Sequence, residues 1–203
     1  EFGGNLIQDG ETIMIHSYSR SLMSCFAHAH KSGKSFTVIC TDSQPTKESR
    51  WAIHDLTSWG IETTFVLDAG MAMIISEADW CLTGADSISN IGSVANKIGT
   101  YQLALLAQKH EKPLYVATEI MKLQTDTIEG YPIHLERRSP DEILDITSEF
   151  EFPDRIKVVH QFFDLTPAIY VRGLITEQGI ISPETICTAW NKFESMFDGM
   201  SQL

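Results

Sequence analysis

The sequence lacks several features that define whole classes of protein. Its 15 lysine and arginine residues are outnumbered by 27 aspartate and glutamate residues, and the formal net charge is −12. Since phosphate backbones are bound by clustered basic side chains, nucleic acid is excluded as the main partner. No apolar run approaches the ~20 residues of a membrane-spanning helix, and the start of the chain has no secretory signal. We therefore expect neither a nucleic acid nor a membrane as a direct partner.

Cysteine is scarce and is not arranged for a disulfide framework or a metal. The four cysteines are Cys25, Cys40, Cys81 and Cys187. They form no Cys-x-x-Cys pair, and we interpret them as buried free thiols in a reducing compartment, which predicts a cytoplasmic protein. His28 and His30 lie two apart on a predicted helix, so they face different directions and do not make a metal pair. We expect no metal and no cofactor.

Two nucleotide-binding motifs are also absent. No G-x-G-x-x-G follows the first predicted strand, and no Gly-Lys-Ser/Thr sequence ends a phosphate-binding loop. The chain instead alternates short apolar runs with helical periodicity. The predicted strands are 12–16, 35–40, 61–67, 79–83, 113–118 and 171–176. The predicted helices are 19–31, 46–59, 69–76, 98–110 and 183–196.

This alternation predicts an α/β fold: a Rossmann-like, doubly wound, mostly parallel sheet with helices on both faces. The pattern loosens over 123–155, where polar, acidic and proline-containing segments predict an insertion or long loop, and order is expected to return at 156–160. Ligands of such sheets bind beyond the carboxyl ends of the strands. The polar segments found there are 16–19, 41–44, Asp68, 84–86 and 119–122.

The most informative stretch runs from Gly84 to Tyr101. A predicted strand ends at Gly84-Ala85, where small residues let a ligand approach the backbone, and Asp86 follows. Lys97 is expected beside the start of the next helix, where backbone N–H groups attract anions, so the expected ligand is a phosphate. Taken singly, Asp86 is as typical of a residue that fixes a turn or caps a helix as of a ligand-binding residue. Lys97 taken singly is more typical of a solvated surface charge. Their joint placement favours a sugar-phosphate site.

Gly84-Ala85-Asp86 with Asn96-Lys97-Ile98-Gly99-Thr100 resembles the signature of a known family. That family contains the alpha, beta and delta subunits of translation initiation factor 2B, ribose-1,5-bisphosphate isomerase and 5-methylthioribose-1-phosphate isomerase. Supporting matches are residues 163–167, 175–177 and the strand leading to Lys122, and they extend over residues 13–183. The resemblance implies that residues 1–203 are a Rossmann-like C-terminal domain, with the family's helical N-terminal domain absent from this chain. It also implies a homodimer or an assembly with related subunits.

The resemblance further implies roles for individual residues. In the isomerases, an aspartate matching Asp86 works with a cysteine in the loop after the first strand, where this chain has Ser17. A hydroxyl is a much weaker acid than a thiol, so Ser17 is expected to hydrogen-bond a sugar without replacing that cysteine. Asp86 is the catalytic residue if the protein is an enzyme. The predicted binding residues for a phosphorylated sugar or nucleotide-like small molecule are Ser17, Ser19, Asn96, Lys97 and Lys122.

Two functions remain open. The Ser43-Gln44-Pro45 sequence and the loop 16–20 resemble the alpha subunit of the initiation factor, since the isomerases usually carry arginine before this proline. Asp86 resembles the isomerases. Our first interpretation is an alpha-subunit-like regulatory protein with a sugar-phosphate pocket, and the alternative is an aldose–ketose sugar-phosphate isomerase. The resemblance also favours a position lining the site for Asp164, over a cap on a helix near Pro167.

Overall fold

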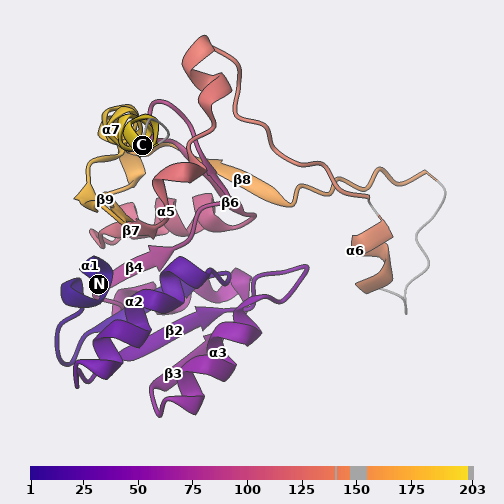
Figure 1. The fold of residues 1–203 in the computed structure, drawn as a ribbon. Helices are drawn as coiled ribbons and strands as arrows, with labels where there is room; N and C mark the ends of the chain where they lie inside the picture. Colours follow the sequence, from indigo (N-terminus) through magenta and orange to yellow (C-terminus); the bar gives the residue numbers. More distant parts are fainter. Residues whose placement is uncertain (140, 147–154, 201–203) are drawn as a thin grey trace.

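A seven-stranded sheet forms the centre of the protein (Figure 1). The computed structural model describes residues 1–139, 141–146 and 155–200. Along the sheet the strand order is β10-β9-β7-β4-β1-β2-β3, and every neighbouring pair is parallel except β9 with β10. These strands are β1 (Thr12–His16), β2 (Thr37–Thr41), β3 (Glu62–Val66), β4 (Trp80–Thr83), β7 (Leu114–Ala117), β9 (Gly173–Thr176) and β10 (Gly179–Ile181). The predicted fold class is confirmed.

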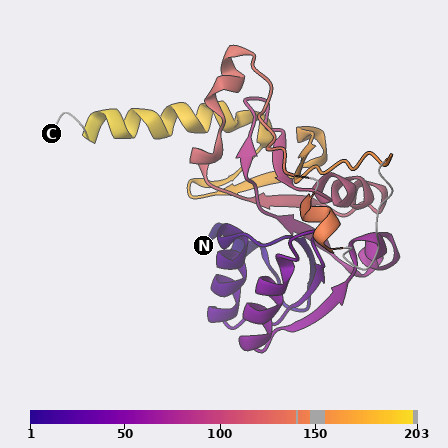
Figure 2. The same ribbon diagram turned by 90° about the vertical axis from the view of Figure 1, so that its right-hand side faces the viewer.

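Helices cover both faces of this sheet (Figure 2). On one face, Phe26 of α2 and Leu56 of α3 share a buried apolar cluster with Ile13 and Ile15 of β1. The other face carries a second cluster, built by α4 and α5. The helices are α1 (Phe2–Leu6), α2 (Arg20–Lys31), α3 (Ser49–Ser58), α4 (Met71–Ile74), α5 (Thr100–Lys109), α6 (Asp141–Ile146) and α7 (Ile186–Met200). Because β1 is covered on both faces, Ile13 to Ile15 are fully buried, as expected for an inner parallel strand.

The chain winds outward from β1 in two directions. It continues through β2 and β3 on one side, then returns to pair β4 with β1 and adds β7 and β9 on the other side. The order of strands therefore reverses between β1 and β4. In doubly wound sheets this reversal leaves a crevice at the carboxyl ends of the two strands, where ligands bind.

A second, three-stranded antiparallel sheet was not predicted. It consists of β5 (Ser87–Ile88), β6 (Val94–Lys97) and β8 (Phe163–Thr166). Lys97 therefore ends strand β6, paired with Phe163, and helix α5 begins at Thr100 rather than directly after Lys97. The expectation that order returns at 156–160 was wrong, because regular pairing begins only at β8. Strands of two to four residues are too short to show a period in the sequence, and β8 lies more than 60 residues from its partner β6.

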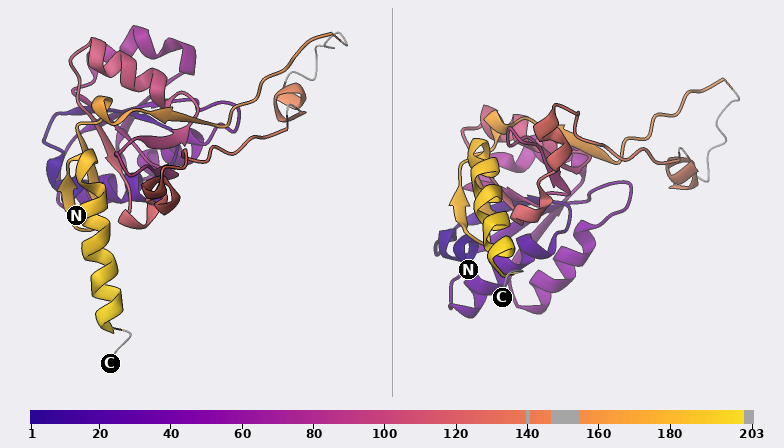
Figure 3. Two further views of the ribbon diagram at one scale, coloured as in Figure 1. Left: turned by 90° about the horizontal axis from the view of Figure 1, so that it is seen from above. Right: turned by 45° about the horizontal axis from the view of Figure 1, so that its top comes forward.

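Three smaller features complete the comparison with the predicted elements. The short helix α1 was missed, and it packs on α2. In the described part of 123–155, a 3₁₀ helix over Thr125–Glu129 and helix α6 are the regular elements, and residues 140 and 147–154 of this predicted insertion lie outside the description. Helix α7 projects from the body of the molecule (Figures 2 and 3). Within the described ranges, no helix is long and apolar enough to cross a membrane.

The thiols agree with their interpretation as unpaired core residues. Cys25, Cys40 and Cys81 are buried, Cys187 is half-buried, and all four are free. Burial raises the pKa of Cys25 to about 11 and that of Cys40 to about 12. Such thiols are protonated at neutral pH and are poor nucleophiles.

Gly99 fixes where helix α5 begins. Its φ is +104°, and a Cβ built there would lie 2.8 Å from both Cε1 and Nε2 of His16. Gly33, after α2, has a φ of +80° and nothing within 4 Å of such a Cβ. Both glycines adopt a positive φ, but only Gly99 has a neighbouring side chain, that of His16, in the space a Cβ would occupy.

We predict that Gly99→Ala destabilises the protein more than Gly33→Ala. Both changes place an L side chain at positive φ, which costs roughly 1–2 kcal/mol, and only Gly99→Ala adds overpacking of roughly 1–3 kcal/mol. Urea denaturation of both variants measures the free energies of unfolding. Equal losses in the two variants would contradict the close approach of Gly99 and His16.

Candidate functional site

Two adjoining cavities lie at the carboxyl ends of β1 and β4. The first has a volume of about 610 Å³ and is lined by Ser17, Asp86 and Lys97 among others. The second has a volume of about 350 Å³, and its lining includes the remaining predicted binding residues, which are Ser19, Asn96 and Lys122. Tyr18 and Asp86 line both cavities. The structure thus gathers all six predicted residues around one place, with Asp86 at the junction.

Gly84 has a different use from the one expected. A Cβ at this position would lie 2.5 Å from Cβ of Ser19 and 2.8 Å from its Oγ. The missing side chain therefore makes room for the start of helix α2, rather than for a ligand. This close approach brings Ser19 beside Asn96 and Asp86 in the second cavity.

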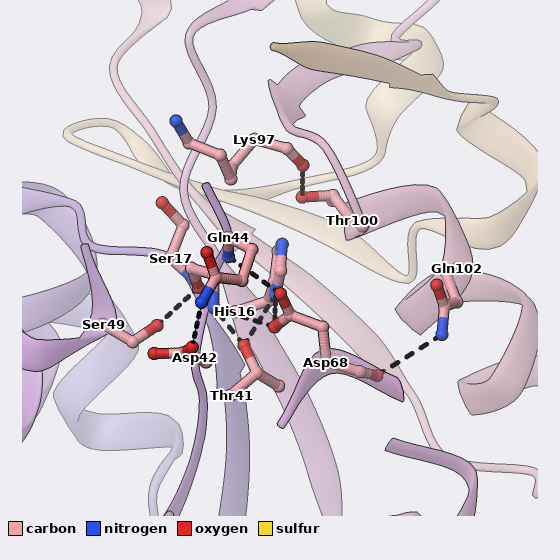
Figure 4. A network of polar contacts seen from close by, with 12 residues as sticks. His16, Ser17, Thr41, Asp42, Gln44, Ser49, Asp68, Lys97, Thr100 and Gln102 are labelled. Carbon is pink, nitrogen blue, oxygen red and sulfur yellow. Dashed lines mark hydrogen bonds and ion pairs between the residues drawn. The ribbon is translucent and has the colours of Figure 1, made fainter. Parts of the chain in front are cut away.

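A buried histidine joins β1, β2 and the segment before α5 (Figure 4). Nε2 of His16 lies 2.7 Å from the carbonyl oxygen of Ile98, and Nδ1 lies 2.7 Å from Oγ1 of Thr41. A carbonyl only accepts, so Nε2 carries the hydrogen and Nδ1 accepts from the Thr41 hydroxyl. Burial lowers the pKa of His16, which keeps the ring neutral. His16 is a structural residue that holds the site's loops together.

The loops after β1 and β2 are fixed by hydrogen bonds to each other and to Asp68. The carboxylate of Asp68 accepts from the backbone N–H of Ser43 and of Gln44, each at 2.8 Å. The Ser43 hydroxyl oxygen accepts from the backbone N–H of Ser17 at 2.7 Å. Both serines adopt positive φ, +68° at Ser17 and +59° at Ser43. Such conformations persist where the surroundings over-determine them, and here they aim Ser17 into the first cavity.

Glu48 bridges two of the predicted binding residues. Its Oε2 accepts a hydrogen bond from the Ser17 hydroxyl at 2.7 Å, and its Oε1 lies 2.9 Å from Nζ of Lys97. Nζ also donates to Oγ1 of Thr46 at 3.1 Å and lies 3.1 Å from the centre of the Phe162 ring. The side chain of Lys97 is 2% exposed, compared with 30% for Glu48. The ammonium is therefore paired and enclosed within the protein.

The surroundings of this pair keep it charged. Burial alone would raise the pKa of Glu48, but the hydrogen bonds from Ser17 and Lys97 and the charge of Lys97 outweigh it and hold the pKa below its ordinary value. Burial lowers the pKa of Lys97, and the nearby carboxylates of Glu48 and Asp86 oppose that change. A lysine paired at 2.9 Å with an ionised carboxylate is itself a cation at neutral pH.

Asp86 is exposed at the junction of the cavities. The protein around its carboxyl group removes part of its hydration, which raises the pKa of Asp86 above the ordinary value, while Lys122 and Lys97 act in the opposite direction. Its backbone N–H donates to the carbonyl of Ala95 at 2.8 Å, so the second sheet holds it in place. A carboxyl group with a raised pKa beside a cavity is a candidate for proton transfer.

The expected anion site at the start of α5 is occupied by the protein's own carboxylate. Asp164 accepts from the backbone N–H of Gly99 at 2.7 Å and of Tyr101 at 3.1 Å. Asp164 therefore caps α5; it does not line either cavity, and it does not cap a helix near Pro167. The Lys97 backbone stays beside this helix start, where its carbonyl accepts from the Thr100 hydroxyl, but its ammonium is held by Glu48, Thr46 and Phe162. The two parts of the predicted phosphate site therefore do not coincide.

Sequence reasoning missed Glu48, Arg138 and Phe162, which line the first cavity. Glu48 stands just before α3 and carries no motif, and the other two come from segments with no periodicity. Only the pairing of β6 with β8 brings Phe162 to Lys97. Among the described residues there is no group of three or more His, Cys, Asp or Glu side chains that could hold a metal ion.

Comparison with known proteins assigns the chain to a family. The model of the initiation factor 2 subunit family, IF-2B, matches residues 1–183. The chain belongs to this family. Its Asp86 and its Asn96-to-Thr100 segment therefore lie in the matched part, as do both cavities.

Relatives within the IF-2B family carry two kinds of name. The chain is 36% identical over 197 residues to ribose 1,5-bisphosphate isomerase of Methanocaldococcus jannaschii, covering 97% of this chain and 62% of the relative. It is 32% identical over 195 residues to the alpha subunit of translation initiation factor eIF2B of Dictyostelium discoideum, covering 92% and 60%. A crystal structure of the Pyrococcus horikoshii OT3 translation initiation factor eIF-2B superposes with a TM-score of 0.75 at 34% identity, covering 90% of this chain and 62% of that one. The chain spans about three-fifths of the length of these relatives.

Asp164, the cap on α5, makes the free energy of unfolding of this IF-2B family member depend on pH. Burial raises the pKa of Asp164 to about 6, against the opposing hydrogen bonds from the amides of Gly99 and Tyr101. Between the ordinary value of 3.8 and about 6, the folded state keeps a proton that the unfolded state has lost. The contribution of Asp164 to stability is therefore full at low pH and falls as the pH rises through this window.

We predict that the free energy of unfolding of the wild type, relative to Asp164→Asn, decreases as the pH is raised from about 4 to about 6 and is then constant. Asparagine does not titrate, so the difference between the two proteins reports Asp164 alone. Urea denaturation at a series of pH values measures it. A difference that is constant across this window would contradict the buried, protonated state of the cap.

Proposed function

We propose that the chain carries the active site of an aldose–ketose sugar-phosphate isomerase, with Asp86 as the group that transfers the proton. The observation that carries this proposal is the position of Asp86, whose raised pKa and exposed carboxyl lie where the two cavities meet. The 36% identity to a ribose 1,5-bisphosphate isomerase supports the same reaction class. Of the two functions expected from the sequence, these findings favour the alternative over the regulatory protein.

The second cavity is the better place for the phosphate of the substrate. Its charged lining residues are Arg20 and Lys122 and the carboxylates of Asp86 and Glu119. In the part of the chain that the structure describes, neither cation has an ion-pair partner within 4 Å. The cavity is also lined by Ser19, the N-cap residue directly before the 12-residue helix α2, which makes no side-chain cap hydrogen bond. Two cations and the first N–H groups of a helix suit a phosphate. Asn96 lines the same cavity and offers its side-chain amide.

The chemistry requires a proton carrier near the sugar carbons. Aldose–ketose isomerisation moves one hydrogen between two neighbouring carbons and one proton between two oxygens. With its phosphate in the second cavity, a sugar reaches across the junction and brings these atoms to Asp86. A pKa raised toward the working pH makes a carboxyl group a better proton carrier than an ordinary aspartate.

We predict that Asp86→Asn lowers turnover of ribose 1,5-bisphosphate or 5-methylthioribose 1-phosphate by roughly 10²–10⁴-fold, since the amide cannot carry the proton. Sugar-phosphate binding, measured by calorimetry on the full-length protein, is expected to persist. In the wild type, kcat/KM falls as the pH is lowered through a pKa above the ordinary value of 3.8 for aspartate. The control is Glu62→Gln, an exposed carboxylate on the outer strand β3. Turnover in Asp86→Asn within tenfold of wild type would exclude Asp86 as the catalytic group.

One observation favours the second candidate, a regulatory subunit that binds a sugar phosphate without turning it over. Ser17 stands where the family resemblance places the cysteine of the isomerases, and its hydroxyl already donates to Glu48 at 2.7 Å. A hydroxyl engaged in this way is a poor proton donor to a substrate. The 32% identity to an eIF2B alpha subunit agrees with this candidate.

Ser17→Cys distinguishes the two candidates. If the site is that of an isomerase, a thiol at this position supplies a stronger acid, and we predict at least a roughly tenfold rise in kcat on the better of the two sugar phosphates. Cys25→Ser is the matched control, because Cys25 is a buried core residue of helix α2 that lines neither cavity. Measurable binding with no turnover in either the wild type or Ser17→Cys would favour the regulatory subunit.

A further inference from the structure

Lys97 has no hydrogen-bond donor left for a ligand. An ammonium has three N–H groups. Here they face Oε1 of Glu48 at 2.9 Å, Oγ1 of Thr46 at 3.1 Å and the ring of Phe162, whose centre lies 3.1 Å from Nζ. The side chain is 2% exposed. An anion reaching Lys97 from the first cavity must therefore displace the Glu48 carboxylate.

The other cation of the first cavity is also neutralised. The guanidinium of Arg138 lies 4.0 Å from the centre of the Phe162 ring, and its nitrogens lie 3.1 Å from Glu136 and 3.5 Å from Glu142. The lining of this cavity carries three carboxylates, on Glu48, Asp55 and Asp86, against the cations of Lys97 and Arg138. The second cavity carries the cations of Arg20 and Lys122 against the carboxylates of Asp86 and Glu119. Its charges balance, whereas the first cavity has an excess of carboxylates, so the second cavity is the more favourable place for a phosphate.

Glu48 occupies the position that an anionic ligand group would take. Its two carboxylate oxygens bind the Ser17 hydroxyl and the Lys97 ammonium, a donor set that would equally hold two oxygens of a phosphate. The carboxylate is 30% exposed, so it faces the cavity. Beside it, Trp51 and Phe163 contribute aromatic surface, which suits an uncharged group.

We propose that Glu48 is a specificity-determining residue, which fills the anion position at Ser17 and Lys97 and so restricts the site to sugars with a single phosphate. The phosphate of the substrate binds in the second cavity, and an uncharged end of the sugar enters the first. This inference rests on the proposed sugar-phosphate site and names its substrate class. A bisphosphate is rejected because its second phosphate meets a carboxylate where it needs a cation.

The test compares ribose 1,5-bisphosphate with ribose 1-phosphate and ribose 5-phosphate, by calorimetry on the full-length protein. In the wild type, we expect at least one monophosphate to bind as tightly as the bisphosphate or more tightly. In Glu48→Gln, which keeps the shape and an acceptor for Ser17, we expect the bisphosphate to gain at least tenfold in affinity relative to the monophosphates. The gain follows because Lys97 is then an unpaired cation.

Asp55→Asn is the matched control, because Asp55 lines the same cavity but pairs with His54, at 3.4 Å, instead of Lys97. It removes one negative charge without freeing the ammonium, and we expect the affinity ratio to change by less than threefold. An equal gain in both variants would overturn the specific role of Glu48. So would a wild type that binds the bisphosphate at least tenfold more tightly than both monophosphates, a result that needs no variant. Binding of none of the three sugars, and none of 5-methylthioribose 1-phosphate, by any of these proteins would instead overturn the proposed function itself.

Discussion

The parallel pairing of β1 with β4 is the constraint on which the rest of the structure depends. The two strands are far apart in sequence, and their pairing at the centre of the sheet reverses the direction in which the chain winds. It brings the residues after one strand, Ser17 to Ser19, beside those after the other, Gly84 to Asp86. Both cavities, and the carboxyl group they share, follow from this contact. The pairing of the two backbones therefore decides which side chains meet at the site.

Much of the motif shared with the family serves to build the site rather than to bind a ligand. Gly84 makes room for Ser19, and Gly99 makes room for His16. Asp164 fills the start of α5, which would otherwise attract an anion. A Cβ at either glycine would collide with its neighbour, and without Asp164 the first amides of α5 would lose their acceptor. A motif of this kind identifies the fold and the place of the site, while its ligand depends on the residues around it.

The pair formed by Glu48 and Lys97 shows how such surroundings alter a site. A lysine at the end of β6, read from the sequence, is a cation available to a phosphate. In the folded protein, the same lysine is enclosed by a carboxylate, a hydroxyl and an aromatic ring. The first cavity is aromatic and its cations are paired, whereas in the second cavity the cations of Arg20 and Lys122 balance the carboxylates of Asp86 and Glu119. The site therefore has two unlike ends. This asymmetry is the physical basis of the proposed selectivity between sugar phosphates.

The sequence by itself determined the α/β class, the order of most strands and helices along the chain, and the position of Asp86 after the end of a strand, because apolar runs and the polar residues that follow them are local signals. The catalytic role of Asp86 stays a prediction. The sequence did not predict the sheet of β5, β6 and β8, because the strands are short and β6 pairs with β8 across more than 60 residues of chain. Nor did it indicate the carboxylate of Glu48 or the ring of Phe162 beside Lys97, since neither carries a motif. Whether a lysine is free or paired depends on which distant side chains reach it. Only the tertiary structure decides that, because the contacts that neutralise a charge are made between segments that the sequence keeps apart.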